Sequence, residues 1–170
     1  MATATSTIAE ALLAELTRET ALMRKCLERV PDGKFDFKPH EKSMSFGRLS
    51  SHIAEIFGWG KAMIETDIFE MKMEDHTPFE ASSNQELLTA FDTGVAEFLE
   101  LLKGQTDEQM TAAWLMKMDG KVAMEGPRVA VIKEMVLNHL IHHRGQLTVY
   151  LRLNDIAVPA IYGPSADEKG

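Results

Sequence analysis

Two histidines four residues apart, His139 and His143, are the side chains of this sequence that most directly indicate chemistry. Residues at positions i and i+4 of a helix lie one above the other, so both imidazoles could reach a single metal ion at about 2.0–2.1 Å. The alternative is that both are ordinary core residues, satisfied by hydrogen bonds. That is harder to achieve for two neighbouring imidazoles, because each needs partners for both ring nitrogens. The pair alone leaves both interpretations open, and a third ligand would favour the metal.

The pair lies on a predicted helix within residues 134–152, EMVLNHLIHHRGQLTVYLR. Apolar residues recur there at steps of three and four, which is the period of one helix face. Both histidines fall on that face. Pro127 suits the first turn of this helix, which is expected to continue to about Asn154. The apolar positions are Met135, Val136, Leu140, Leu147, Tyr150 and Leu151.

Three further long helices are predicted from the same periodicity, over about 7–30, 45–69 and 83–104. Each starts at a residue type that caps helix N-termini, namely Thr7, Ser45 and Ser83. Between the third and fourth helices, residues 114–124 alternate around an Asp-Gly pair, which is typical of a β-hairpin. The sequence therefore predicts an all-α four-helix bundle in one domain, residues 1–170, with the hairpin as a short excursion.

A bundle of this kind builds metal sites in its core from side chains on facing helices. His52 lies among core-facing positions of the second helix and is the natural third ligand for His139 and His143. The sequence contains neither the Glu-x-x-His pairs of a di-iron bundle nor a His-Glu-x-x-His motif. Ligation by nitrogen alone suits zinc, nickel, copper or iron. Zinc is the first choice, from its availability and its tetrahedral preference.

Residues close in sequence to the histidines are candidates for supporting the site. Glu55, three residues after His52, is a hydrogen-bond acceptor or general base, or else a solvated carboxylate. Arg144 and Gln146 are expected to anchor a neighbouring loop or to fix ligand orientation, rather than to react with substrate. His142 points about a quarter-turn away from the pair and is expected at the surface or in a subunit interface. His76, in a charged loop, is expected to be solvated.

Composition limits the classes of function. The formal net charge of −8 comes with no long basic cluster, which argues against binding to nucleic acid. No apolar run approaches the length of a membrane span, and the N-terminus lacks the features of a signal peptide, so a cytoplasmic location is expected. The single cysteine, Cys26, falls in the apolar stripe of the first helix and is expected to be a small core residue.

The string HLIHHRGQ at 139–146, with His52 upstream and PAIYGP at 159–164, resembles the DinB-like superfamily of damage-inducible metalloproteins over nearly the whole chain. The resemblance implies a bundle of up-down-down-up topology, a divalent metal ion on the three histidines, and frequent homodimers. Methionines and an aromatic residue beyond what one core needs are the candidate dimer surface: Phe69, Met71 and Met73.

Characterised relatives in that superfamily use a low-molecular-weight thiol, bacillithiol or mycothiol, in S-transfer or isomerisation. The resemblance thus implies a metal-dependent thiol transferase acting on a small-molecule electrophile. Three neutral imidazoles leave a metal ion its full charge and an open position, where a thiol would ionise more readily. Water in that position would instead give a hydrolase. The other class of function left open is a non-catalytic metal-binding protein that acts in a stress response or in an interaction with a partner. A funnel beside the histidines would favour the enzyme.

Overall fold

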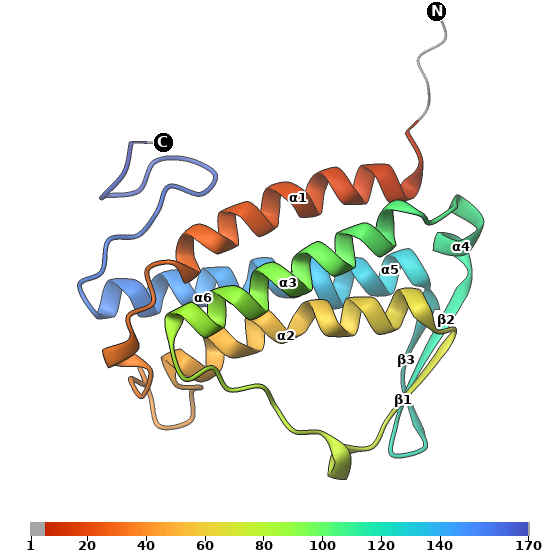
Figure 1. The fold of residues 1–170 in the computed structure, drawn as a ribbon, viewed down its shortest axis with the longest axis horizontal. Helices are drawn as coiled ribbons and strands as arrows, with labels where there is room; N and C mark the ends of the chain where they lie inside the picture. Colours follow the sequence, from red (N-terminus) through yellow and green to blue (C-terminus); the bar gives the residue numbers. More distant parts are fainter. Residues whose placement is uncertain (1–5, 170) are drawn as a thin grey trace, which may run out of the picture.

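The computed structural model describes residues 6–169 as four long helices, one short helix and a small sheet (Figure 1). The first three long helices are α1 (Ile8–Leu27), α2 (Phe46–Glu65) and α3 (Asn84–Lys103). The fourth runs without interruption through α5 (Arg128–Ile132), a π-helical segment (Lys133–Asn138) and α6 (His139–Leu153). Helix α1 and the fourth helix run in one direction, and α2 and α3 in the other (Figure 1). This agrees with the up-down-down-up order that the resemblance implies.

Capping side chains fix where the helices begin. Thr7 closes a capping box at the start of α1, and Ser45 accepts a hydrogen bond from the third residue of α2. Short α4 (Asp107–Thr111) has a capping box as well. The sequence Ser83-Asn-Gln-Glu86 also has the form of a capping box, but at the start of α3 this box is incomplete, because the Glu86 carboxylate binds Ser82 rather than Ser83. The caps therefore place the helix starts close to where the sequence predicts them.

The core lies between the four long helices and is built from their apolar stripes. Phe46, Phe57, Phe91 and Phe98 are almost fully buried in it. Gly60 of α2 is required by a close crossing, because a Cβ atom there would lie 2.8 Å from the ring of Phe98 on α3. Among the described residues, no helix is both long and apolar enough to cross a membrane.

A three-stranded sheet departs from the purely all-α prediction. Strand β2 (Ala113–Met118) pairs antiparallel with β3 (Lys121–Pro127), as the hairpin signal predicts. The turn residues Asp119 and Gly120 both have positive φ, 49° and 77°, which suits a tight hairpin. Strand β1 (Ile68–Met71) adds to β2 in parallel.

The extra strand corrects the predicted end of the second helix. Helix α2 stops at Glu65, and Phe69 belongs to β1 instead of the helix. Its strand conformation depends on hydrogen bonds to β2, which lies far along the chain, so periodicity within 45–69 could not reveal it. The protein is mostly helical with a small sheet at one end of the bundle (Figure 1).

Candidate metal centre

Three imidazoles from two helices converge in the bundle. His52 comes from α2, and His139 and His143 lie one turn apart on α6. One ring nitrogen from each lies within 4.8 Å of the others. The Nε2 atoms of His52 and His139 are 3.3 Å apart. Two nitrogens bound tetrahedrally at about 2.0–2.1 Å from one zinc ion lie about 3.4 Å apart, so this spacing fits shared ligation.

The orientation of His143 leaves one ring nitrogen without a partner. Its Nδ1 lies 2.7 Å from Oε1 of Gln146, and since an amide oxygen only accepts, Nδ1 carries the proton. Its Nε2 is therefore the atom with a free lone pair. Among the described residues that atom is buried without any hydrogen-bond partner. A buried acceptor left unpaired is costly, and a metal ion would satisfy it. The residues present fit a bound metal ion.

The other two rings also have protein partners. Nδ1 of His52 lies 3.3 Å from Oε2 of Glu55, and His139 makes a hydrogen bond with the backbone of Met135. Such outer partners hold metal-binding imidazoles in the correct tautomer and orientation. Glu55 is only 9 % exposed and also accepts hydrogen bonds from Arg48 and from the backbone N–H of Phe79. The alternative of a solvated carboxylate at Glu55 is therefore wrong.

Burial keeps the three imidazoles in the form that binds metal. Removal from water lowers the pKa of His52, His139 and His143 below the ordinary value, because burial penalises the charged ring. Neighbouring imidazoles of the cluster lower each pKa further. All three are consequently neutral at neutral pH, with lone pairs available for an ion.

A π-helical segment directly precedes His139, and the sequence does not predict it. Residues Lys133–Asn138 follow i→i+5 hydrogen bonding, which adds one residue to the turn and rotates α6 by about 100° relative to α5. Such segments occur often at functional sites. Its residue types, KEMVLN, carry no signal for it. The segment sets the direction in which α6 presents its two histidines.

Arg144, next to His143, is directed away from the imidazoles into a buried ion pair. Its guanidinium binds the carboxylate of Glu19 on α1 at 2.6 Å, and both side chains are at most 3 % exposed. The hydroxyl of Tyr162 donates to the same carboxylate at 2.6 Å. Arg144 thereby ties the C-terminal segment and α1 to α6, the anchoring role expected for it. His142 is exposed, as expected.

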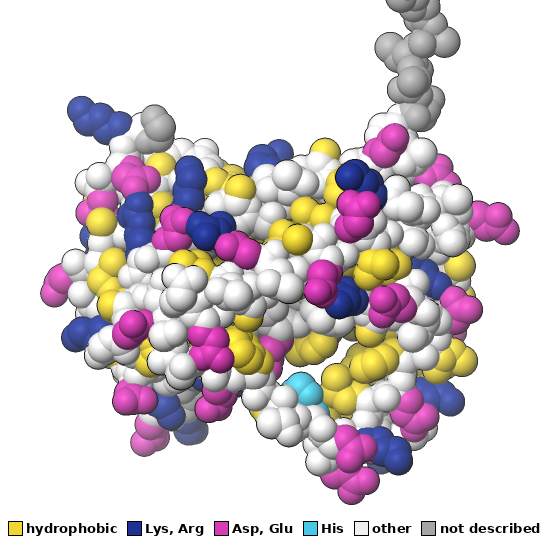
Figure 2. Space-filling model, viewed as in Figure 1, with side chains coloured by type: hydrophobic (Ala, Val, Ile, Leu, Met, Phe, Trp, Pro, Cys, Tyr) yellow, Lys and Arg dark blue, Asp and Glu magenta, His cyan; other side chains and the backbone are white. Residues whose placement is uncertain are grey.

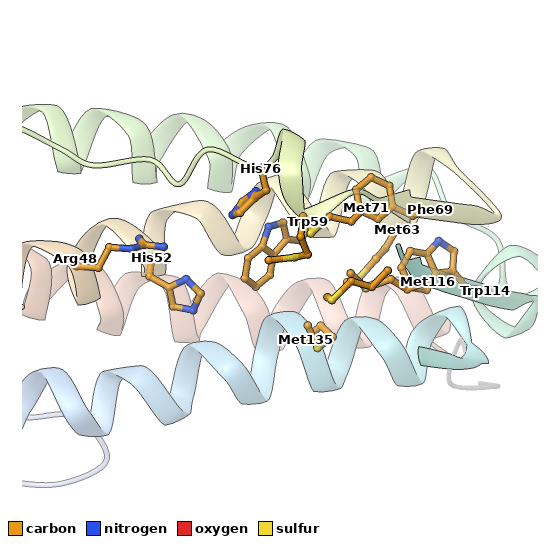
Figure 3. A pocket seen from close by; sticks show the side chains of 12 residues that line it. Arg48, His52, Trp59, Met63, Phe69, Met71, His76, Trp114, Met116 and Met135 are labelled. Carbon is orange, nitrogen blue, oxygen red and sulfur yellow. The ribbon is translucent and has the colours of Figure 1, made fainter. Parts of the chain in front are cut away.

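A cavity of about 270 Å³ borders His52 and opens toward the sheet. Figure 2 shows a hollow lined by hydrophobic side chains with a histidine at its edge. In Figure 3, Trp59 lies between His52 and a group of methionines. The Trp59 ring is 5.3 Å from that of His52 and 5.7 Å from that of His139. The lining residues are Arg48, His52, Trp59, Met63, Phe69, Met71, Met73, His76, Trp114, Met116, Met118 and Met135.

Several of these lining residues have surroundings that the sequence does not predict. His76, expected to be solvated, is partly buried and lines the cavity. Phe69, Met71 and Met73, the candidate dimer surface, also line it, and the homodimer itself stays a prediction. The sequence predicts Trp59 only as a core position of α2. The sequence signal that could have revealed the cavity is the concentration of methionines in 63–73 and 116–118.

A second cavity, of about 400 Å³, borders His143 and Gln146. The loop before α2 contributes Lys42 and Ser43 to it, so its character is more polar than that of the first cavity. The histidine cluster thus has open space beside two of its three members, His52 and His143. That is the arrangement expected of a site that small molecules reach, rather than of a sealed structural one.

The fold and the histidine cluster together define a helical-bundle protein with three imidazoles that could hold a metal ion. The chain belongs to the DinB family, which it matches over residues 1–169. In sequence it is similar to the uncharacterized protein YrdA of Bacillus subtilis (strain 168), at 26% identity over 151 residues, 88% of this chain and 85% of the relative. The uncharacterized protein YjoA of the same organism is 28% identical over 130 residues, 74% and 77% of the two chains.

Solved structures show the same fold. A DinB-like protein from Bacillus cereus ATCC 10987 superposes with a TM-score of 0.68 at 23% identity, covering 90% of this chain and 97% of that one. The DinB-like protein YjoA of Bacillus subtilis gives a TM-score of 0.67 at 20% identity, over 88% and 95% of the two chains. At these identities the likeness concerns the fold.

Proposed function

We propose that this protein binds one divalent transition metal ion through His52, His139 and His143 and transfers a low-molecular-weight thiol to an electrophile. The observation that carries the metal assignment is the buried, unpartnered Nε2 of His143 beside the 3.3 Å pair of Nε2 atoms. Zinc fits best, because three neutral nitrogen ligands and an open fourth position suit its tetrahedral preference. Nickel, iron and copper are the other candidates.

The metal ion, when bound, would supply a Lewis acid that lowers the pKa of a thiol or of water at its open position. The chain's own residues have the tasks of orientation and exclusion. Glu55, Gln146 and the Met135 backbone hold the three rings. The Trp59 ring packs at a steep angle against His52 and tilted against His139, which places a large apolar group beside both imidazoles.

The thiol has to come from outside the chain. Cys26 is the only cysteine and is fully buried in α1. Burial raises the pKa of its thiol to about 11, so it is protonated at neutral pH and unable to act as a nucleophile. A small external thiol would enter through one of the two cavities beside the histidines, and the more polar one suits the hydrophilic part of such a molecule.

A hydrolase that uses metal-bound water is the second enzymatic candidate, supported by the same cluster and by the partly buried Glu55 as a nearby base. A non-catalytic metal-binding protein of a stress response is the remaining one. The two cavities beside the histidines favour a reaction over simple storage of the ion.

Metal analysis of the purified protein tests the first half of the proposal. We expect close to one equivalent of metal per chain, lost in His139→Ala and retained in His142→Ala, the matched control on an exposed face of the same helix. A His139→Ala variant that kept a full equivalent would refute the ligand set. A screen of thiols against electrophilic acceptors tests the second half, with ester and amide substrates as the arm for hydrolysis.

We also propose that the protein forms a homodimer, on the resemblance to its superfamily. Light scattering at micromolar concentration should then give twice the mass of one chain, and the mass of a single chain would contradict it.

A further inference from the structure

The cavity beside His52 contains far more apolar surface than metal ligation requires. Six of the eleven methionines of the chain line it, and so do both tryptophans. They come from α2, β1, β2, the π-helical segment and the connection after β1. Figure 3 shows four of the methionines, Met63, Met71, Met116 and Met135, on the side of Trp59 that faces away from His52. The six methionines are Met63, Met71, Met73, Met116, Met118 and Met135.

The hollow is open to solvent at Met73 and Met118, and apolar hollows that remain exposed often mark ligand-binding sites. Water is a poor occupant, because an ordered water needs two to four polar partners. The only ionisable groups in the lining are Arg48, His52 and His76, and Arg48 is already bound to Glu55. The remaining side chains are apolar apart from their indole N–H groups, of which that of Trp114 is buried without a hydrogen-bond partner among the described residues. The cavity therefore favours an apolar occupant.

The residue types in the lining favour an aromatic occupant in particular. Thioether sulfurs make favourable contacts with aromatic rings, and flexible methionines adapt to ligands of different shape. Trp59 and Trp114 add large flat faces against which a ring can stack. A cavity of about 150 Å³ with apolar walls is enough for benzene, so one of about 270 Å³ accepts a substituted ring.

We propose that this methionine-lined cavity is the binding site of the electrophile, an apolar aromatic small molecule. Met73 and Met118 are 49% and 36% exposed and form the mouth, whereas Met63 and Trp114 are buried at the base. At its other end the cavity borders His52, with Trp59 between this imidazole and the methionines labelled in Figure 3. The identification as electrophile rests on the proposed function, but binding of the ring depends on the cavity alone.

Methyl-labelled methionine gives a site-specific NMR test on the full chain as purified, with nitrobenzene as the probe. Ring currents should shift the methyl signals of the six lining methionines, while Met23, Met44, Met110 and Met124 serve as internal controls outside the cavity. n-Hexanol, an apolar probe without a ring, should bind more weakly. Absence of shifts, shifts spread evenly over all methionines, or tighter binding of n-hexanol would each overturn the proposal.

Two variants place a charge in the cavity. Met116→Glu, in the wall, should weaken nitrobenzene binding at least about tenfold, because a carboxylate beside an apolar ligand must be desolvated. Met73→Glu, at the exposed mouth, should also weaken binding, and its exposure protects the fold. Val122→Glu is the matched control on the same sheet, 59% exposed and outside the lining. Unchanged binding in both Met73→Glu and Met116→Glu would overturn the proposal.

Different results would contradict ring binding in the cavity and thiol transfer by the protein. Nitrobenzene shifts confined to the six methionines, in a protein that transfers no thiol, would support the cavity assignment and remove the transferase. Thiol transfer to an aromatic acceptor without any shift at those methionines would support the transferase and overturn the cavity assignment.

Discussion

The carboxylate of Glu55 lies 3.3 Å from Nδ1 of His52, one turn along α2. The same carboxylate accepts hydrogen bonds from Arg48 and from the backbone of Phe79, in the loop that leads from the cavity wall to α3. One buried group therefore orients an imidazole and fixes the position of a loop. A change at Glu55 is expected to act on metal binding through this geometry.

Glu55→Ala should weaken metal binding about 10- to 100-fold, the usual effect of removing the partner of a metal-binding imidazole. Glu55→Gln, which keeps an acceptor oxygen, should restore part of the affinity. Competition with a chromophoric chelator measures both, and circular dichroism checks that the helices persist. Glu65→Gln, at the exposed end of α2, is the control. Equal affinities for wild type and Glu55→Ala would show that the contact does not support the site.

Removal of the metal should leave the bundle folded. Helices α1 and α3 bury full apolar stripes without any histidine, and burial contributes about 25 cal/mol per Å² whether or not an ion is bound. An ion that binds only the folded state adds stability by mass action, so the melting temperature should fall on chelation. Circular dichroism before and after chelation provides the test. Loss of most of the helical signal at room temperature would indicate a structural metal and remove the main support for catalysis.

The metal-free protein should become less stable as the pH falls below about 6.5. In the unfolded chain the three histidines take up protons near their ordinary pKa of 6.5, whereas burial lowers their pKa in the folded chain. The unfolded state then binds more protons, so the free energy of unfolding decreases with falling pH. Above that pH the rings are neutral in both states and contribute no slope.

Urea unfolding at about pH 7.5 and about pH 5.5 measures this pH dependence. The double variant His52→Gln/His139→Gln should show a smaller difference between the two conditions. Glu19 contributes little to this difference. Desolvation opposes its ionisation, but hydrogen bonds from Tyr162 and Arg144 prevail and lower its pKa, so the folded protein keeps it ionised at both pH values. Stability that stayed constant or rose toward pH 5.5 would contradict the assignment.

Removing only one partner of the ion pair between Glu19 and Arg144 should lower the free energy of unfolding strongly. Glu19→Ala leaves the guanidinium buried without its carboxylate, at a cost of about 3–5 kcal/mol in the free energy of unfolding. Tyr162→Phe removes one hydrogen bond and should cost about 1–2 kcal/mol. Denaturant unfolding measures both. A loss below about 1 kcal/mol in Glu19→Ala would mean that water replaces the carboxylate.

The thiol of Cys26 should be unreactive in the folded protein. It is fully buried, and burial raises its pKa to about 11, so both access and ionisation are unfavourable. A disulfide reagent at neutral pH should label it only in denaturant, with one thiol per chain as the total. Fast labelling of the native protein would show that α1 opens locally and would make Cys26 a candidate nucleophile.

Local chemistry in the sequence is sufficient for much of this protein. Thr7 and Ser45 start helices because their side chains bind backbone N–H groups within the same turn. Asp119-Gly120 makes a hairpin because both residues tolerate positive φ. The histidine pair on α6 follows from a spacing of four residues, and His52 is identified because its position in the apolar stripe of α2 faces the same core. Each of these signals is contained within a few residues or one helix face.

The tertiary structure alone decided what surrounds the histidines. Strand β1 forms only because β2, far along the chain, offers it hydrogen bonds, and this brings Phe69 and Met71 into a cavity wall. The π-helical segment before His139 has no residue signature in KEMVLN. Glu55 is buried by contacts with Arg48 and with the distant Phe79. Such features depend on groups that meet only in the folded chain, so no spacing in the sequence specifies them.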